Sequence, residues 1–181
     1  MEAIDRRVTR VVLTGSESTG KSTLAGALAL HYGAELVPEF VRGFAEAHGG
    51  RIEFSDHGAI ARGQMALEDE HLARAGRVVI QDTDLLSTVV YCRHYFGRCP
   101  PWIEEAAAAR KPDLYLVCQT DAPWVADGVR DRGHLREDMQ RLFLSAVTAS
   151  AAPRVDISGT LEVRLAVAID AIDRYIEASG G

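Results

Sequence analysis

The segment GSESTGKS at residues 15–22 constrains this chain more than any other feature, because it fits the phosphate-loop pattern G-x-x-x-x-G-K-[ST]. The apolar run VVL at residues 11–13 precedes it, as expected of a strand. A helical pattern follows, with Leu24 and Leu28 one turn apart, and it closes on Gly33, a residue suited to a left-handed cap. Strand, loop and helix in this order predict a site for a nucleoside triphosphate.

The residues of this loop have distinct physical roles. Gly15 and Gly20 let the backbone curl so that successive N–H groups, with the positive end of the following helix, hold phosphate oxygens. Lys21 is expected to reach the β- and γ-phosphates, and the Ser22 hydroxyl to ligate Mg²⁺. We therefore expect ATP and Mg²⁺ as cofactors, with adenine beside the loop at residues 157–160. The predicted nucleotide contacts are Gly15, Glu17, Ser18, Thr19, Gly20, Lys21, Ser22, Thr23 and Gly159.

Composition narrows the class of protein. The chain has 181 residues, 47% hydrophobic and 25% charged, which predicts one globular domain over residues 1–181. A net charge of −6 argues against a nucleic-acid partner, because displacing counterions from phosphates needs a basic face. Residues 1–10 lead into a short strand without a long apolar segment, so we expect no signal peptide, no membrane span and a cytoplasmic protein. Cys92, Cys99 and Cys118 lack C-x-x-C spacing and are expected to be reduced thiols; the oligomeric state stays open.

Strand-like and helix-like stretches alternate along the chain, as in a parallel sheet covered by helices. We predict an α/β fold with three layers, a phosphate-loop NTPase domain whose five parallel strands follow the kinase-type order 2-3-1-4-5. The strands are expected at residues 8–14, 34–38, 77–82, 113–118 and 154–157. The helices are expected at residues 22–32, 41–48, 56–75, 85–96, 101–110, 134–150 and 161–177.

Acidic residues follow the second and third predicted strands. Ligands of parallel sheets collect at the carboxyl ends of the strands, so we expect Glu39, Asp82 and Asp84 to face the phosphate loop. Asp82 has the position of a carboxylate that holds Mg²⁺ through its water shell, which makes Ser22 and Asp82 the predicted metal site; a plain turn residue is the alternative. Asp84 either contacts substrate hydroxyls or caps the helix that begins at Leu85.

Glu39 bears on the type of reaction. A kinase needs a carboxylate beside the acceptor hydroxyl, whereas a nucleotide hydrolase needs a residue that orients water. A glutamate after the second strand faces the acceptor side, across from the phosphate loop. We predict Glu39 as the general base, with Asp84 as the other candidate and a solvated surface glutamate as the alternative interpretation of Glu39.

A polar, aspartate-rich segment at about residues 121–136 is predicted to form a lid. Arg130 and Arg132 lie in it, and Arg136 opens the next helix. Arginines that close over the phosphates neutralise charge on the migrating phosphoryl group, and a charge-compensated exposed loop is the alternative. The predicted catalytic residues are Lys21, Glu39, Asp82, Arg130 and Arg132.

Several blocks, in order along most of the chain, resemble the ribosylnicotinamide kinase domain of bacterial trifunctional NAD-biosynthesis regulators and its stand-alone relatives. The first blocks are the phosphate loop, E-F-x-R at residues 39–42 and I-A-x-G at residues 60–63. The distinguishing ones are D-T-D at residues 82–84 and P-W-V-A-D-G-x-R at residues 123–130. The resemblance implies transfer of the ATP γ-phosphate to the 5′-hydroxyl of nicotinamide riboside, giving nicotinamide mononucleotide.

The same resemblance implies the acceptor site. Trp124 is a candidate to lie against the nicotinamide ring, with Phe40 as a second apolar wall, since a cationic pyridinium is well held by an indole face. Core or lid packing is the alternative for either ring. Deoxynucleoside kinases, which look like more distant relatives, read the base with a glutamine on the corresponding helix. Gln64 is the candidate on this helix here, although a plain exposed helix glutamine is the favoured interpretation. The predicted substrate contacts are Glu39, Phe40, Arg42, Gln64, Asp84 and Trp124.

Other functions were weighed against this one. The DNA-binding helix pair and the adenylyltransferase signature of the trifunctional proteins are missing from this sequence, so we expect neither transcriptional regulation nor dinucleotide synthesis from it. A GTPase would need an N-K-x-D motif, and the sequence contains no asparagine. A ring-forming ATPase would normally add a helical lid domain and an interfacial arginine system. A kinase of another nucleoside or small hydroxyl metabolite, a stand-alone ATPase and a nucleotide sensor remain alternatives.

Overall fold

A computed structural model describes residues 7–121 and 135–180, so the predicted sites at Trp124, Arg130 and Arg132 lie outside the described residues. Its core is a five-stranded sheet in the order β2-β3-β1-β4-β5, and every pairing between neighbouring strands is parallel. The strands are β1 (Thr9–Thr14), β2 (Glu35–Val37), β3 (Val78–Asp82), β4 (Leu114–Cys118) and β5 (Arg154–Ile157). The predicted fold class and strand order are confirmed.

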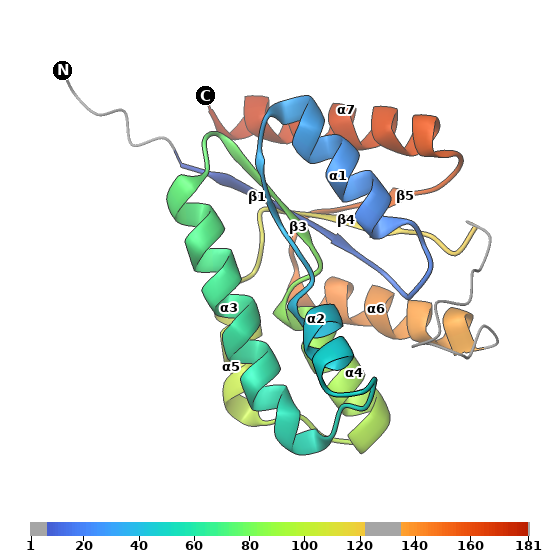
Figure 1. Ribbon diagram of the computed structural model, residues 1–181. Helices are drawn as coiled ribbons and strands as arrows, with labels where there is room; N and C mark the ends of the chain where they lie inside the picture. The colour runs from blue at the N-terminus through green and yellow to red at the C-terminus, as the bar shows by residue number, and fades with distance from the viewer. Residues whose placement is uncertain (1–6, 122–134, 181) are drawn as a thin grey trace.

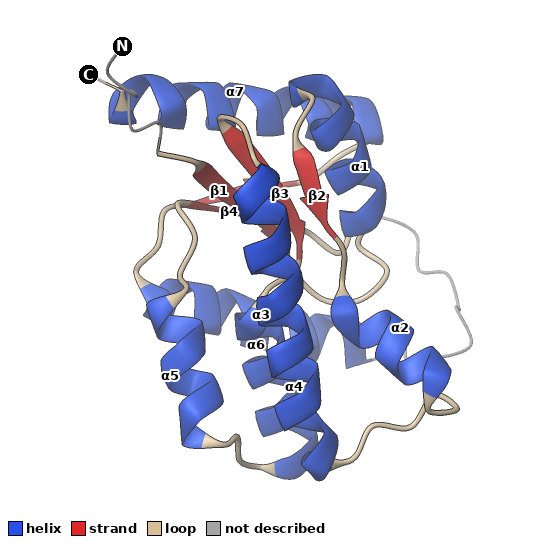
Figure 2. Cartoon of the chain, turned by 60° about the vertical axis from the view of Figure 1, so that its left-hand side comes forward, coloured by secondary structure: helices blue, strands red, loops and turns tan. Residues whose placement is uncertain are grey.

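Helices cover both faces of this sheet, which makes three layers (Figure 1). Helices α1 (Lys21–Tyr32) and α7 (Leu161–Ser179) lie on one face. Helices α3 (His57–Arg74), α4 (Leu85–Phe96), α5 (Pro101–Ala109) and α6 (Arg136–Ser150) lie on the other side. The short helix α2 (Phe40–Ala47) and the 3₁₀ turn η1 (Phe54–Asp56) connect β2 to α3 and project from the sheet (Figure 2).

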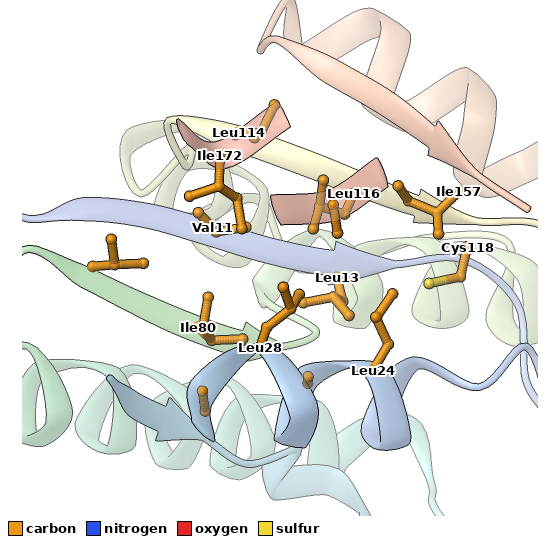
Figure 3. Packing of buried hydrophobic residues seen from close by; sticks show 14 residues of the cluster. Val11, Leu13, Leu24, Leu28, Ile80, Leu114, Leu116, Cys118, Ile157 and Ile172 are labelled. Atoms are coloured by element: carbon orange, nitrogen blue, oxygen red, sulfur yellow. The ribbon is translucent and has the colours of Figure 1, made fainter. Parts of the chain in front are cut away.

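The main core fills the space between the sheet and helices α1 and α7. Leu24 and Leu28 of α1 and Ile172 of α7 meet Leu13 and Ile80 of the central strands there, all of them buried (Figure 3). The central strands are buried on both faces, which is why they read as apolar runs without polar alternation. The opposite face of the sheet packs against α6 through a smaller cluster of Val12, Tyr115, Val117 and Val147.

The predicted elements agree with the structure to within two residues at nearly every boundary. α4 and β5 have the predicted bounds, and Gly33 ends α1 in the left-handed conformation with φ +57°, as expected. The sequence did not indicate the 3₁₀ turn that precedes α3. Within residues 7–121 and 135–180, the chain has no helix with the length and apolar character needed to cross a membrane.

Candidate active site

The phosphate loop connects the end of β1 to α1 and is held tightly against β4. Gly15 has φ +128°, and a Cβ atom there would lie 2.6 Å from the carbonyl oxygen of Cys118, so only glycine fits. Gly20, with φ +80°, adopts the left-handed conformation directly before the first residue of α1. The Lys21 ammonium donates to the carbonyl oxygen of Ser16 at 2.5 Å. The lysine is therefore buried against the loop that its own neighbours form.

The two residues predicted to hold Mg²⁺ are in direct contact. The Ser22 hydroxyl donates to Oδ2 of Asp82 at 2.6 Å, across from the end of β3. Oδ1 of Asp82 is buried and has no hydrogen-bond partner among the described residues. Burial raises the pKa of Asp82, and the hydrogen bond from Ser22 opposes that rise. A buried carboxylate oxygen without a partner is costly, and a cation would relieve it.

Glu39 lies on the same edge of the sheet. It is the residue before α2, and its side chain is only 8% exposed, so the interpretation as a solvated surface glutamate is wrong. Arg42 lies one turn further on, with its Nε 3.6 Å from a carboxylate oxygen of Glu39. The Glu39 charge contributes to raising the pKa of Asp82, which means that the two carboxylates share one electrostatic environment. Glu39 and Asp82, one of the two residues predicted to bind Mg²⁺, thus lie near each other, as expected.

A cavity of about 610 Å³ lies beside these carboxylates, lined by residues of α2, α3 and α4 among others. Its described lining contains three carboxylates, from Glu17, Glu39 and Asp84, and one arginine, Arg51. The remaining lining residues are Val41, Ala45, Gly50, Ile52, His57, Ile60, Gln64, Thr83, Ser87, Thr88, Tyr91, Tyr95 and Phe96. Acidic groups near the phosphate loop and aromatic rings farther along α4 make this cavity suitable for an acceptor with a polar sugar and a flat ring.

Asp84 caps α4, which is one of the two roles predicted for it. Its Oδ1 accepts the backbone N–H of Leu86 and caps α4, while its Oδ2 accepts the Tyr115 hydroxyl at 2.6 Å. The residue also lines the cavity. Burial raises the pKa of Asp84 to about 6, opposed by the Tyr115 hydrogen bond. Both carboxylate oxygens of Asp84 therefore already accept hydrogen bonds within the protein.

Thr83 forms the turn that presents these two aspartates. It adopts φ +69°, a conformation that a β-branched residue rarely takes, and its backbone N–H donates to Leu13 at 3.0 Å. Such a backbone costs on the order of 1–3 kcal/mol and persists where the surroundings impose it. The strain places Asp82 toward the phosphate loop and Asp84 at the start of α4.

Gln64 differs from the expectation. The favoured interpretation as an exposed helix glutamine is wrong, since the residue is 3% exposed and lines the cavity. Its Oε1 accepts the first backbone N–H of α2, that of Phe40, and its Nε2 contacts Glu68 at 3.5 Å. The amide is therefore engaged in joining α3 to α2, which leaves little of it to read a base.

Phe40 also differs from the expectation, because its ring packs on α3. A Cβ atom added to Gly63 would lie 2.2 Å from the Phe40 ring, so this ring can pack here only because residue 63 has no side chain. Phe40 does not appear among the lining residues of the cavity, and among the described residues the aromatic wall comes from α4. This packing explains the I-A-x-G block, and it supports the packing alternative for Phe40.

Sequence reasoning missed the aromatic side of the cavity. Thr88, Tyr91 and Tyr95 follow Asp84 at intervals of three or four residues, which places all of them on one face of α4. The Tyr91 and Tyr95 rings are parallel, with centroids 6.2 Å apart. That spacing was visible in the sequence once Asp84 was suspected. The sequence prediction assigned Glu17 only to the nucleotide, although its buried side chain also lines this cavity.

The remaining predicted nucleotide contacts lie around the phosphate loop. Ser18 has φ +54°, Thr19 is buried with its hydroxyl donating to Ser16, and Thr23 is exposed on α1. Gly159 follows β5 with φ +97°, and its backbone N–H donates to Asp121 at 2.5 Å. The loop after β5 is thus tied to the end of β4.

Comparison with known proteins now places the chain. Residues 10–164 match a protein-family profile described as an AAA domain. The chain belongs to this AAA domain family. The trifunctional NAD biosynthesis/regulator protein NadR of Escherichia coli is 32% identical to it over 143 residues, which cover 76% of this chain and 35% of NadR. The AAA domain chain therefore spans about a third of the length of this relative, and its homology to NadR confirms the family resemblance.

Solved structures agree with this relationship. The crystal structure of NadR protein in complex with NR superposes with a TM-score of 0.82 at 25% identity, covering 94% of this chain and 52% of that one. Thymidylate kinase from Ehrlichia chaffeensis superposes with a TM-score of 0.68 at 16% identity, over 91% of this chain and 98% of that one. At that identity the second likeness shows the fold alone. This AAA domain chain thus has the fold of a phosphate-loop kinase.

Proposed function

We propose that this protein is an ATP-dependent kinase that phosphorylates the 5′-hydroxyl of a nucleoside, and that the nucleoside is nicotinamide riboside. The observation that carries the proposal is the placement of Glu39 in one cavity with an aromatic wall, beside a complete phosphate loop. Homology to NadR, whose structure was solved with NR, supports this acceptor. The domain is proposed to act as a single unit, with residues 121–136 as its lid.

The charge of the cavity favours a cationic acceptor. Glu17, Glu39 and Asp84 outnumber Arg51 along its described lining. Nicotinamide riboside carries a pyridinium ring, which both carboxylates and aromatic faces stabilise. The Tyr91 and Tyr95 rings line the same cavity as Glu39, and we propose that they contact the pyridinium ring. Trp124 is proposed to add to this wall from the lid, and Arg42 and Gln64 are proposed as further contacts of the nucleoside.

The residues present fit a bound Mg²⁺. Ser22 and Asp82 would hold it, and the buried Oδ1 of Asp82 has no other partner among the described residues. No group of three or more acidic, histidine or cysteine side chains within the described ranges could enclose a metal. That suits Mg²⁺ in kinases, which takes one or two protein oxygens and completes its shell with phosphate and water. When bound, the ion would neutralise charge on the transferring phosphoryl group.

The transfer itself asks for alignment and one proton acceptor. The backbone amides of residues 17–21 and the Lys21 ammonium would hold the triphosphate. Glu39 would accept the proton of the acceptor hydroxyl while the hydroxyl oxygen forms a bond to the γ-phosphorus. The bond between that phosphorus and the β,γ-bridging oxygen breaks, and ADP leaves with the electron pair. Arg130 and Arg132 are proposed to approach the phosphates from the lid.

Incubation with Mg-ATP and a panel of nucleosides tests this proposal, with the products read by mass. We expect nicotinamide riboside to gain one phosphoryl group faster than adenosine, thymidine or uridine. A preference for another nucleoside would overturn nicotinamide riboside as the acceptor and still support the kinase activity. The kinase proposal would be overturned if no nucleoside in the panel gained a phosphoryl group while ATP was consumed.

A further inference from the structure

Arg164 is a buried arginine that neither the phosphate-loop motif nor the family blocks indicate. It lies in the first turn of α7, and its side chain is 4% exposed. A cation near the N-terminus of a helix is unfavourable, because the helix dipole is positive there. Burying a guanidinium adds a desolvation cost that only complete hydrogen bonding offsets. The residue therefore needs compensating contacts at this place.

Its contacts join three segments that surround the predicted nucleotide site. Nη1 donates to the carbonyl oxygen of Thr19 in the phosphate loop at 2.6 Å. Nε donates to the carbonyl oxygen of Gly159 after β5 at 2.8 Å, and Nη2 to that of Gln119 after β4 at 3.2 Å. The planar guanidinium thus fixes the relative positions of three backbone segments at once.

Asp121 completes this arrangement. Its Oδ1 forms an ion pair with Arg164, and its Oδ2 accepts the backbone N–H of Gly159 at 2.5 Å. The Gly159 hydrogen bond is the main cause that lowers the pKa of Asp121, with the nearby charge of Arg164 adding to it. Both ends of the carboxylate are therefore used within the same three-segment junction.

We propose that Arg164 is a positioning residue of the nucleotide site. It holds the Thr19 carbonyl outward, so that the loop keeps the curvature in which its N–H groups converge on phosphate, and it holds Gly159 beside that loop. It acts through the backbone rather than by touching ATP. This inference rests on the proposed function only in taking ATP as the phosphoryl donor.

The test is the affinity for Mg-ATP, measured by calorimetry without any acceptor, in Arg164→Lys and Arg164→Ala. Lysine keeps the positive charge and lacks the planar guanidinium that donates to three carbonyl groups at once. We therefore expect the dissociation constant for Mg-ATP to rise on the order of 10-fold in both variants. Methylguanidinium is expected to restore much of the affinity of Arg164→Ala and none of that of Arg164→Lys. The affinity for nicotinamide riboside should stay within about twofold.

A matched control lies on the same helix. Arg174 pairs with Asp170 on the exposed face of α7, so Arg174→Ala removes an arginine and an ion pair without reaching the loop, and ATP affinity should not change. An unchanged ATP affinity in folded Arg164→Lys would overturn the inference. So would a parallel loss of thermal stability, ATP binding and acceptor binding, since that pattern marks a purely structural role. Absence of nucleoside phosphorylation would defeat the proposed kinase activity and leave this binding test intact.

Discussion

The nucleotide side and the acceptor side of this site are built in different ways. The nucleotide side is one continuous loop, held to the ends of β4 and β5 by side chains that bond its backbone. Gln140, for example, accepts the Ser16 N–H at 2.9 Å and donates to the Cys118 carbonyl at 3.0 Å. The proposed acceptor side is a cavity lined by residues of the phosphate loop, α2, α3, α4 and the segments that connect them.

The difference teaches where specificity resides. A backbone loop binds any triphosphate tail, because every residue supplies the same N–H group. A side-chain cavity changes with each substitution, so under the proposed function the residues that line this cavity decide the acceptor. Variants on one side should therefore leave binding on the other side intact, and this independence can be tested.

The largest effect is expected for Lys21→Met on the nucleotide side. Losing the ammonium removes charge stabilisation of the transferring phosphoryl group, so turnover should fall by at least about 10²–10³-fold. Acceptor affinity, measured by calorimetry, should remain within about twofold. A comparable loss of acceptor affinity would show that the two sides are not separate.

The next effect is expected for Glu39→Gln on the acceptor side. Glutamine keeps the shape and cannot accept the hydroxyl proton, so turnover should fall by at least about 10²-fold while ATP affinity is nearly unchanged. Glu46→Gln, on the exposed face of α2, which begins directly after Glu39, is the matched control and should behave as the wild type. Wild-type turnover in Glu39→Gln would remove Glu39 from the base role.

Gly63→Ala should affect the acceptor side and spare the nucleotide side, because it changes only the packing of Phe40 against α3. The added methyl group would meet the Phe40 ring, which must move and carry the start of α2 and Glu39 with it. We expect the free energy of unfolding to fall by about 1–3 kcal/mol and the KM for the acceptor to rise, with the KM for ATP unchanged. Gly43→Ala on α2 has open space around the new methyl group and should stabilise by about 0.5–1 kcal/mol. Equal stability of the two alanine variants would contradict the packing of Phe40 on Gly63.

A smaller, pH-dependent effect is expected at Asp84. Its pKa in the folded state is raised to about 6 from an ordinary value of 3.8, mainly by burial. The folded state therefore holds the proton where the unfolded chain has lost it, and this stabilisation, complete below pH about 4, disappears as the pH rises through about 6. Relative to Asp84→Asn, the wild type should lose about 2 kcal/mol of stability between pH 4 and pH 7 in chemical denaturation. A stability difference that does not vary over that range would contradict the raised pKa.

The sequence was sufficient for the features that are local. The phosphate loop, its flanking strand and helix, and the acidic strand ends are short patterns in which neighbouring residues meet by geometry alone. Gln140 and Arg164 were not predictable in this way, because they reach the loop from residues far along the chain, and a polar residue in a helix gives no sign of its partner. The exposure of Gln64 was misjudged for the same reason, since the N–H group that donates to its side chain belongs to Phe40 of another helix.

The acceptor wall was predictable only in part. The spacing of Asp84, Thr88, Tyr91 and Tyr95 indicates one helix face, although it does not say whether that face meets a core or a cavity. Helix α2 projects away from the sheet (Figure 2), and residues of α2, α3 and α4 line the cavity. Such a space follows from how the elements pack, and no short pattern records it.

The most direct test of the account is the rate of ADP release with and without saturating nicotinamide riboside at fixed Mg-ATP. If Glu39 and the cavity direct the phosphoryl group to a sugar hydroxyl, the acceptor should raise the rate on the order of 10²-fold, with one phosphorylated riboside formed per ADP. ADP released at the same rate without acceptor, and no phosphorylated riboside, would contradict it.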